Sequence, residues 1–242
     1  MQRRVVLVTG GTRGLGRGIS QAFTDAGDRV VVCGRSAGDG PGRFVACDVR
    51  DPASVDALVA DVMTNEGRLD LVVNNAGGSP SALVAEASPR FAERIIALNL
   101  VAPLYVARAA QAVMPEGGHV INIGSVAAVR PAPGTAAYAA AKAGLTVLTR
   151  ALALEWAPRV RVNQVTVGLL ETERTADTYG DDVTQVAATV PMGRLATVQD
   201  VANACLALAS PALSYVTGAD LFVDGGGEVP AFHAALAKES HG

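Results

Sequence analysis

Tyr138 and Lys142 are the residues whose types and spacing most clearly suggest proton chemistry. They stand one helical turn apart in the run Ala136–Trp156, whose pattern is helical, so both side chains project from one helix face. A free tyrosine titrates near ~10, and a neighbouring ammonium lowers that pKa by favouring the phenolate. Ser125 ends the preceding apolar run and could donate a hydrogen bond to a carbonyl oxygen. These side chains predict acid–base chemistry at a carbonyl or alcohol.

A glycine-rich turn, Thr9-Gly10-Gly11-Thr12-Arg13-Gly14-Leu15-Gly16, follows the first apolar strand and opens a helix. Glycines permit a tight turn and let a pyrophosphate approach backbone N–H groups, and the helix N-terminus adds partial positive charge. This placement predicts a dinucleotide site. The expected contacts are Gly10, Thr12, Arg13, Gly14, Leu15 and Gly16. An ordinary strand-to-helix turn is the alternative interpretation, and the spacing is not the common GxGxxG.

The end of the second strand bears on which dinucleotide binds. The stretch Val32-Cys33-Gly34-Arg35-Ser36 lacks the acid that accepts from the ribose 2′-OH in NAD enzymes. Arg35, with Arg13 in the glycine turn, favours a 2′-phosphate through charge-assisted hydrogen bonds. NADP(H) is therefore the predicted cofactor, although two arginines that merely face solvent would give the same sequence.

Polar residues also follow the third and fourth strands, as Asp48-Val49 and Asn74-Asn75-Ala76-Gly77. The carboxyl ends of such strands converge on a ligand crevice. Asp48 could accept a hydrogen bond from an adenine amino group, with Val49 beside it. Asn75, Ala76 and Gly77 could shape the backbone near the adenosine half, although this tetrapeptide is also an ordinary turn.

The elements that must position these residues alternate along the chain. Strands are predicted over Arg4–Thr9, Arg29–Cys33, Arg43–Cys47, Leu69–Val73, His119–Ile123, Arg161–Val165 and Asp220–Val223, and helices over Gly14–Ala26, Pro52–Asn65, Pro89–Val113, Ala136–Trp156 and Thr197–Leu208. The strands are continuous apolar runs, which is typical of parallel strands covered on both faces. The sequence predicts an α/β fold: a Rossmann-type, doubly wound, mostly parallel seven-stranded sheet with helices on both faces.

Composition limits the class of protein. The 242 residues are 50% hydrophobic and 18% charged with a net charge of −3, which excludes disorder and a large basic surface for nucleic acid or anionic membrane. No apolar run approaches the ~18 residues of a membrane span, and the N-terminus does not look like a signal peptide. We expect a single domain over residues 1–242 in the cytoplasm, with a substrate lid at about 168–196 and a C-terminal tail at about 227–242 that includes a short helix, Ala231–Lys238.

The cysteines and histidines carry no recognisable motif. Cys33, Cys47 and Cys205 form no CxxC pair, so no disulfide framework is implied. The three histidines have no ligand-like spacing, and no metal site is expected.

At this point the chain resembles the short-chain dehydrogenase/reductase family, over Val5 to Gly226. The resemblance rests on Thr9-Gly10-x-x-x-Gly14-x-Gly16, Asp48, Asn74-Asn75-Ala76-Gly77, Asn99, Ser125, Tyr138-x-x-x-Lys142 and Val223-Asp224-Gly225-Gly226. It implies that Tyr138 is the general acid/base and that Lys142 holds the nicotinamide ribose and lowers the tyrosine pKa. It also implies that Ser125 orients the carbonyl oxygen and that Asn99 positions a water in the proton relay behind Lys142. From the residues alone, Asn99 would be a kink site or a buried polar group.

The chain departs from the family after the sixth strand, where Pro-Gly is common. Here the stretch reads Val167-Gly168-Leu169-Leu170-Glu171-Thr172, so the backbone is less restricted at Val167. Contacts to the nicotinamide carboxamide are still expected from Gly168, Leu170 and Thr172, and Glu171 is expected to face solvent.

The resemblance implies an NADP(H)-dependent oxidoreductase that reduces a ketone or oxidises a secondary alcohol. A hydrophobic substrate such as a 3-oxoacyl thioester is expected, in a pocket with contributions from Ala127, Ala128, Val129, Pro133, Leu169, Leu170 and Met192. An NAD-dependent alcohol or hydroxysteroid dehydrogenase of the same fold and a non-catalytic dinucleotide sensor remain the alternatives. The family implies dimers or tetramers, and Ala107, Ala109, Ala110, Ala151 and Ala153 would allow close approach of helices between subunits.

Overall fold

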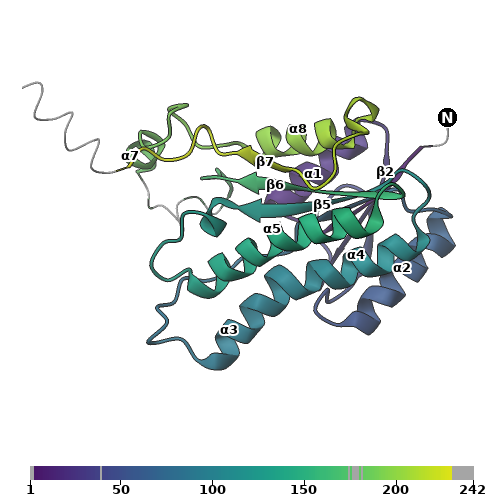
Figure 1. Cartoon of the computed structure of the whole chain (residues 1–242), viewed down its shortest axis with the longest axis horizontal. Coiled ribbons are helices and arrows are strands. Elements are labelled where there is room, and N and C mark those ends of the chain that lie inside the picture. The colour runs from purple at the N-terminus through teal and green to yellow at the C-terminus, as the bar shows by residue number, and fades with distance from the viewer. Residues whose placement is uncertain (1–2, 39, 174, 176–179, 181, 231–242) are drawn as a thin grey trace, which may run out of the picture.

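The computed structural model describes residues 3–38, 40–173, 175, 180 and 182–230, and its centre is a seven-stranded parallel sheet (Figure 1). The strands are β1 (Val5–Thr9), β2 (Arg29–Gly34), β3 (Arg43–Ala46), β4 (Leu71–Asn74), β5 (Gly118–Ser125), β6 (Val160–Val167) and β7 (Asp220–Val223). Their order is β3-β2-β1-β4-β5-β6-β7, and every neighbouring pair is parallel. The predicted α/β fold class is confirmed.

Helices cover both faces of the sheet, as Figure 1 shows. The helices α1 (Gly14–Asp25) and α8 (Val198–Ala209) pack on one face, and α2 (Pro52–Glu66), α4 (Ala102–Val113) and α5 (Ala136–Trp156) pack on the other. The other helices of the described residues include α3 (Pro89–Ile96) and the short α7 (Thr184–Ala187), with single 3₁₀ turns at Val126–Ala128 and Pro211–Leu213. Each face of the sheet therefore has its own apolar core.

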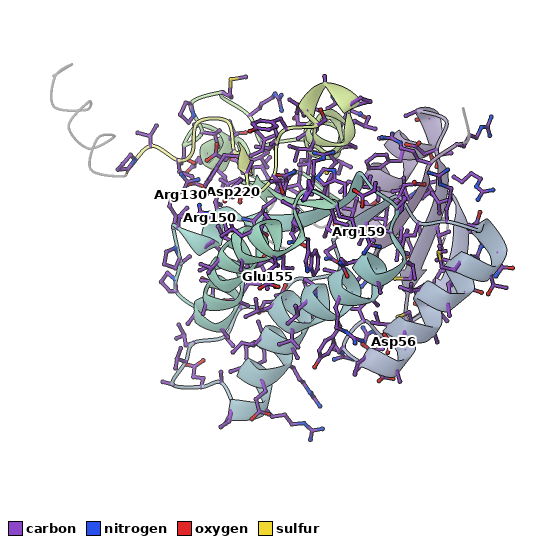
Figure 2. All side chains as sticks on the ribbon, turned by 45° about the vertical axis from the view of Figure 1, so that its right-hand side comes forward. Asp56, Arg130, Arg150, Glu155, Arg159 and Asp220 are labelled. Carbon is purple, nitrogen blue, oxygen red and sulfur yellow. The ribbon has the colours of Figure 1, made fainter. Side chains whose placement is uncertain are left out.

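The burial of the strands explains their unbroken apolar sequences. All five residues of β1 are buried, with alternate side chains entering the two cores. Ion pairs tie the covering helices together at the surface: Arg108 on α4 binds Asp56 at 2.9 Å, and Figure 2 shows Asp56 on α2. The apolar runs thus position the sheet, and polar residues are left to the strand ends.

Side-chain caps set the helix starts that proline and polar residues predicted. Asp51 accepts from the Ala53 N–H at 3.1 Å before Pro52, and Ser88 accepts from the Phe91 N–H at 3.2 Å before Pro89. Thr197 forms a capping box with Asp200 at the start of α8. The helix starts at Pro52, Pro89 and Thr197 agree with the predicted ones to within one residue.

The predicted helix Pro89–Val113 is continuous but not uniform. A π-helical turn, Ala97–Val101, separates α3 from α4 and contains Asn99. By length and composition this helix, with a mean hydropathy of 1.4 in its most apolar window, could cross a membrane, contrary to our expectation that no segment could. Its apolar inner face, which includes Ala102, Val106 and Ala110, lies in the core against the sheet, so core packing accounts for the composition.

The strand order places a crevice at the carboxyl end of the sheet. The chain leaves β1 toward β2 and β3, and then returns to the other side of β1 as β4. In doubly wound sheets ligands bind at this switch point, beyond the carboxyl ends of the strands. The glycine-rich turn after β1 and the Asn-Asn-Ala-Gly stretch after β4 meet there.

Candidate active site

A groove of about 590 Å³ runs along the carboxyl ends of β1 to β4. Thirteen of the predicted cofactor contacts line it: Gly10, Thr12, Arg13, Gly14, Leu15, Gly16, Arg35, Asp48, Val49, Asn75, Ala76, Gly77 and Thr172. Residues that were not predicted as cofactor contacts also line it: Cys33, Gly34, Ser36, Ala37, Gly38, Cys47, Arg50, Leu98 and Glu173. The fold therefore brings residues far apart in the chain to one elongated polar site.

The glycine turn has a geometry that only glycine supports at Gly16. A Cβ there would lie 2.2 Å from the Gly10 carbonyl oxygen and 2.4 Å from Asn75 Nδ2. Gly14 has a φ of +51°, and a Cβ there would have no neighbour within 4 Å. The backbone is thus tight behind the turn and open in front of it, which fits a pyrophosphate held against the first N–H groups of α1.

Asn75 fixes the glycine turn to the end of β4. Its Nδ2 donates to the carbonyl oxygens of Thr9 at 3.0 Å and Gly10 at 3.3 Å. In return the Thr9 hydroxyl accepts from the N–H groups of Asn75 and Ala76, both at 3.0 Å. Asn75 shapes the backbone here because its side-chain amide satisfies carbonyl oxygens that have no partner strand beyond the ends of β1 and β4.

Three arginines, Arg13, Arg35 and Arg50, line the end of the groove that is expected to hold the adenosine half of the dinucleotide. Arg13 and Arg35 are both exposed at its lining. Arg50, which sequence reasoning missed, binds Asp48 through Nε at 2.9 Å and Nη2 at 2.5 Å. These bonds lower the pKa of Asp48 to about 2. Asp48 is therefore an ionised carboxylate that already accepts hydrogen bonds from Arg50. An adenine amino group could donate only to the lone pairs of Asp48 that Arg50 does not use.

The predicted acid–base pair lies on one face of α5. Lys142 Nζ is 5.7 Å from the centre of the Tyr138 ring, and it donates to the Ile123 carbonyl oxygen at 2.7 Å. The lysine is buried, and this desolvation lowers its pKa to about 8. Tyr138 is half-buried. The spacing along the helix therefore produces the proximity that it predicts.

Asn99 lies next to Gly77, a residue that lines the groove. Its side chain is buried and donates through Nδ2 to the carbonyl oxygens of Gly78 at 3.0 Å and Ile95 at 2.9 Å, while its Oδ1 accepts from the Gly78 N–H at 2.9 Å. A Cβ on Gly77 would lie 2.8 Å from Asn99 Oδ1 and 3.5 Å from Lys142 Nζ. Asn99 and Lys142 thus adjoin the same groove-lining glycine.

Ser125 ends β5, beside Val167 at the end of β6. It is half-buried, and its Oγ accepts from the Ala127 N–H at 3.2 Å. Since a hydroxyl can accept and donate at once, this bond leaves its O–H to donate to another group. The segment it opens packs against α5, which carries Tyr138.

The segment after β6 contributes less to the groove than expected. Thr172 lines it, but Gly168 and Leu170 do not. A Cβ on Gly168 would lie 2.7 Å from Asp224 Cα, so this glycine is needed for close packing against the segment after β7. Leu170 pairs with Ala196 and packs on the core. Glu171 is exposed, as expected.

A second cavity, of about 290 Å³, adjoins Tyr138. Its lining is mostly apolar: Ser79, Ala82, Val84, Ala87, Ser88, Pro89, Phe91, Ala92, Gly134, Ala136, Ala137 and Tyr138. None of the residues that we expected to line the substrate pocket contributes to it. The 79–92 segment replaces them because the Ala82 N–H donates to the Gly134 carbonyl oxygen at 3.0 Å, which holds this segment against the loop before α5.

The described part of the chain contains no cluster of His, Cys, Asp or Glu that could hold a metal ion.

Comparisons with known proteins agree with this arrangement. A family model described as enoyl-(acyl carrier protein) reductase matches residues 10–228. The 3-oxoacyl-[acyl-carrier-protein] reductase FabG of Escherichia coli is 34% identical over 235 residues, which cover 92% of this chain and 96% of the relative.

Solved structures share the whole fold. The ligand-free aldohexose dehydrogenase of Thermoplasma acidophilum has a TM-score of 0.89 and 30% identity over 93% of this chain and 94% of its own. A blue fluorescent protein from a metagenomic library, solved in complex with NADPH, has a TM-score of 0.85 and 34% identity over 92% of this chain and 97% of its own. The chain belongs to the short-chain dehydrogenase/reductase family, whose members are oxidoreductases that use a nicotinamide dinucleotide.

Proposed function

We propose that this protein is an NADP(H)-dependent carbonyl reductase, able to run in reverse as an alcohol dehydrogenase, with Tyr138 as its general acid/base. One observation carries the proposal: α5 runs from the apolar cavity to a glycine that lines the groove. Tyr138 lines the apolar cavity, and Lys142, one turn further on, lies beside Gly77 of the dinucleotide groove. A carbonyl group at Tyr138 would therefore have a proton source at its oxygen and a bound nicotinamide within reach of its carbon.

When bound, the dinucleotide supplies the hydride for reduction. Tyr138 donates its phenolic proton to the carbonyl oxygen, and Ser125 donates a hydrogen bond to the same oxygen as negative charge develops on it. The Lys142 ammonium stabilises the resulting phenolate, because it lies near the ring and little water screens it. Asn99 holds the backbone at Gly78 beside Lys142, where a water could return a proton to the amine.

The arginines at the adenosine end support a preference for NADP(H). Arg13 and Arg35 are exposed and available to a 2′-phosphate, and Arg50 adds a third guanidinium to the lining. Asp48 balances part of the charge of Arg50. The one relative named here with a dinucleotide in its structure holds NADPH. An NAD-dependent dehydrogenase of the same fold is the alternative.

The apolar cavity supports a ketone with a hydrophobic substituent, such as a 3-oxoacyl thioester. Val84, Phe91 and Ala92 offer such a group contact area beside Tyr138. The named substrate class of the Escherichia coli relative agrees with this, whereas the aldohexose of the Thermoplasma acidophilum relative would need more polar partners. A cytoplasmic homo-oligomer is part of the proposal. A sensor that binds dinucleotide without turnover is a second alternative.

NADPH oxidation against a panel of ketones and 3-oxoacyl thioesters tests the proposal. We expect Tyr138→Phe to lower kcat by about 10²- to 10⁴-fold, the usual contribution of a general acid, while NADPH binding is retained. Tyr215→Phe, at a fully exposed position, is the matched control and should leave turnover unchanged. Near-normal turnover of Tyr138→Phe would remove the proposed acid, and NADPH binding without turnover across the panel would favour the sensor.

A further inference from the structure

Arg130, which the proposed mechanism does not use, lies five residues after Ser125 in the loop between β5 and α5 (Figure 2). Its Nη2 is 3.1 Å from Asp224 Oδ2, and its Nε is 2.6 Å from Glu228 Oε2. The side chains of these two acids are only 13% and 27% exposed, so water screens the ion pairs less than it would at an open surface. This ion-pair cluster joins the loop after the serine to the segment after β7.

The segment after β7 leaves room for the guanidinium because it contains Gly227. A Cβ on this residue would lie 2.3 Å from Arg130 Nη1, so a side chain there would push the guanidinium away from its two carboxylates. Gly227 also has a φ of +85°, which glycine adopts more easily than any other residue. The guanidinium therefore lies directly against the backbone of the segment that carries both acids.

On the other side, Arg130 ends the turn that supports Ser125. The Arg130 N–H donates to the Val126 carbonyl oxygen at 2.8 Å, as does the Val129 N–H at 3.0 Å. Within the same turn the Ala127 N–H donates to Ser125 Oγ at 3.2 Å. A single helical turn is not stable by itself, because fixing its backbone costs more free energy than its few hydrogen bonds return. The turn therefore depends on side-chain contacts, and the ion-pair cluster supplies them at its C-terminal end.

The segment that carries the two acids is also hydrogen-bonded to the expected substrate lid, residues 168–196. The Met192 N–H donates to the Gly225 carbonyl oxygen at 3.2 Å. Further along, the Val229 N–H donates to the Thr189 carbonyl oxygen at 2.7 Å. These bonds flank the acids on both sides. The ion-pair cluster therefore links three segments: the turn after the serine, the segment after β7 and the end of the expected lid.

We propose that Arg130 is a positioning residue, which couples the orientation of Ser125 to the end of the lid through its ion pairs. A hydroxyl stabilises charge on a carbonyl oxygen only if it points at that oxygen, so a frayed turn weakens the hydrogen bond without removing the donor. Arg130 lines neither the groove nor the apolar cavity, so it acts through the serine. The effect on turnover rests on the proposed function of Ser125, but the physical link between the three segments does not.

A double-mutant cycle on kcat tests whether Arg130 acts through the serine, with the ketone or 3-oxoacyl thioester that the wild-type protein reduces fastest. We expect Arg130→Met to lower kcat roughly tenfold, a part of the about 10²- to 10³-fold that loss of one donor to an oxyanion costs, and to leave the Kd of NADPH unchanged. In a Ser125→Ala background the same change should alter kcat less than about twofold, because the hydroxyl that Arg130 positions is gone. Equal losses in the two backgrounds would overturn the proposal.

Hydrogen exchange of the purified protein, measured by mass spectrometry, tests the link between the segments without turnover. We expect faster exchange in Arg130→Met over residues 126–130 and 189–192, because amides in both segments depend on the cluster. Unchanged exchange in either segment would contradict the link. A wild-type protein that turns over no substrate would remove the proposed function, and the exchange data would still decide whether the segments are coupled.

Arg43→Met is the matched control. Arg43 also binds two carboxylates, Asp61 at 2.6 Å and Glu66 at 3.0 Å, but it does so at the start of β3, away from the carboxyl end of the sheet. This variant should leave kcat and the exchange of both segments unchanged. If Arg130→Met does not fold, Glu228→Gln removes one ion pair, and the same measurements should change in the same direction by smaller factors.

Discussion

Arg35 is the residue whose charge most directly tests cofactor choice. It is exposed at the groove, whereas the charge of nearby Arg50 is shared with Asp48. Since a charge-assisted hydrogen bond contributes about 1.5–3 kcal/mol, we expect Arg35→Asp to raise the Kd of NADPH on the order of 10- to 100-fold and to change that of NADH little. Fluorescence titration with each dinucleotide measures both constants.

A matched variant controls for the change in total charge. Arg150 lies on the exposed side of α5, in Figure 2 on the helix that also carries Glu155, and does not line the groove. Arg150→Asp should leave both dissociation constants unchanged. Equal losses for NADPH and NADH in Arg35→Asp would show that this arginine does not read the 2′-phosphate.

Site residues differ in how far their sequence context reveals them. Tyr138 and Lys142 lie one turn apart in a long helix, so their proximity follows from helix geometry alone. The pairing of Asp48 with Arg50 follows from side-chain rotamers after a short strand, and no periodicity encodes it. The apolar cavity was missed for a related reason, since it forms only where the 79–92 segment packs against the loop before α5.

At the scale of elements, the strands were predictable because burial on both faces leaves an apolar signature. Observed strand ends differ from the predicted ones by up to two residues. The largest differences are at the start of β4, which begins at Leu71, and at the ends of β5 and β6, which run on to Ser125 and Val167. The π-helical turn at Asn99 could not be read from periodicity, because one wide turn barely alters the apolar pattern of a 25-residue helix. The tail helix predicted at Ala231–Lys238 lies outside the described residues.

His119 in β5 links the amino-terminal ends of two neighbouring strands. Its ring nitrogens face donors of Arg161 at 3.2 Å and Asn163 at 2.9 Å, both in β6. A neutral ring carries one N–H and accepts through its other nitrogen, whereas a protonated ring would set an N–H against the donor at both positions. Burial, with repulsion from Arg161 and Arg4, lowers the histidine pKa to about 3. The fold therefore stabilises the neutral ring.

The lowered pKa of His119 makes the free energy of unfolding depend on pH. A folded-state pKa below the ordinary ~6.5 gives stability that is present above pH ~6.5 and is lost as the pH falls toward 3. We expect the free energy of unfolding to drop by about 2 kcal/mol between pH 7 and pH 5, and His119→Gln to flatten this slope whatever its own stability. Urea titrations across this range measure it. An unchanged slope in the variant would assign the loss to other groups.

At the scale of the whole molecule, the alanines that we expected between subunits are mostly inside this chain. Ala107, Ala110 and Ala153 are buried against the sheet, because α4 and α5 turn their small residues toward the strands. The residues left exposed on the outer faces of these helices are larger: Leu104 is 36% exposed, Val147 65% and Leu154 85%. The sequence indicated correctly that α4 and α5 are apolar on more than one face, but it could not show which of these faces packs against the sheet.

Val147 and Leu154 stand two turns apart on the same outer face of α5, and exposed apolar side chains in such a row favour burial against another copy of the chain. We expect a homo-oligomer through this face, and Leu154→Glu to shift it toward the monomer, since an unpaired carboxylate would be buried there. Sedimentation velocity at micromolar concentration measures the change. Ala60→Glu, on the exposed side of α2, adds the same charge elsewhere and should leave the assembly intact. A wild-type monomer, or an unaltered oligomer of Leu154→Glu, would place the subunit contact elsewhere or remove it.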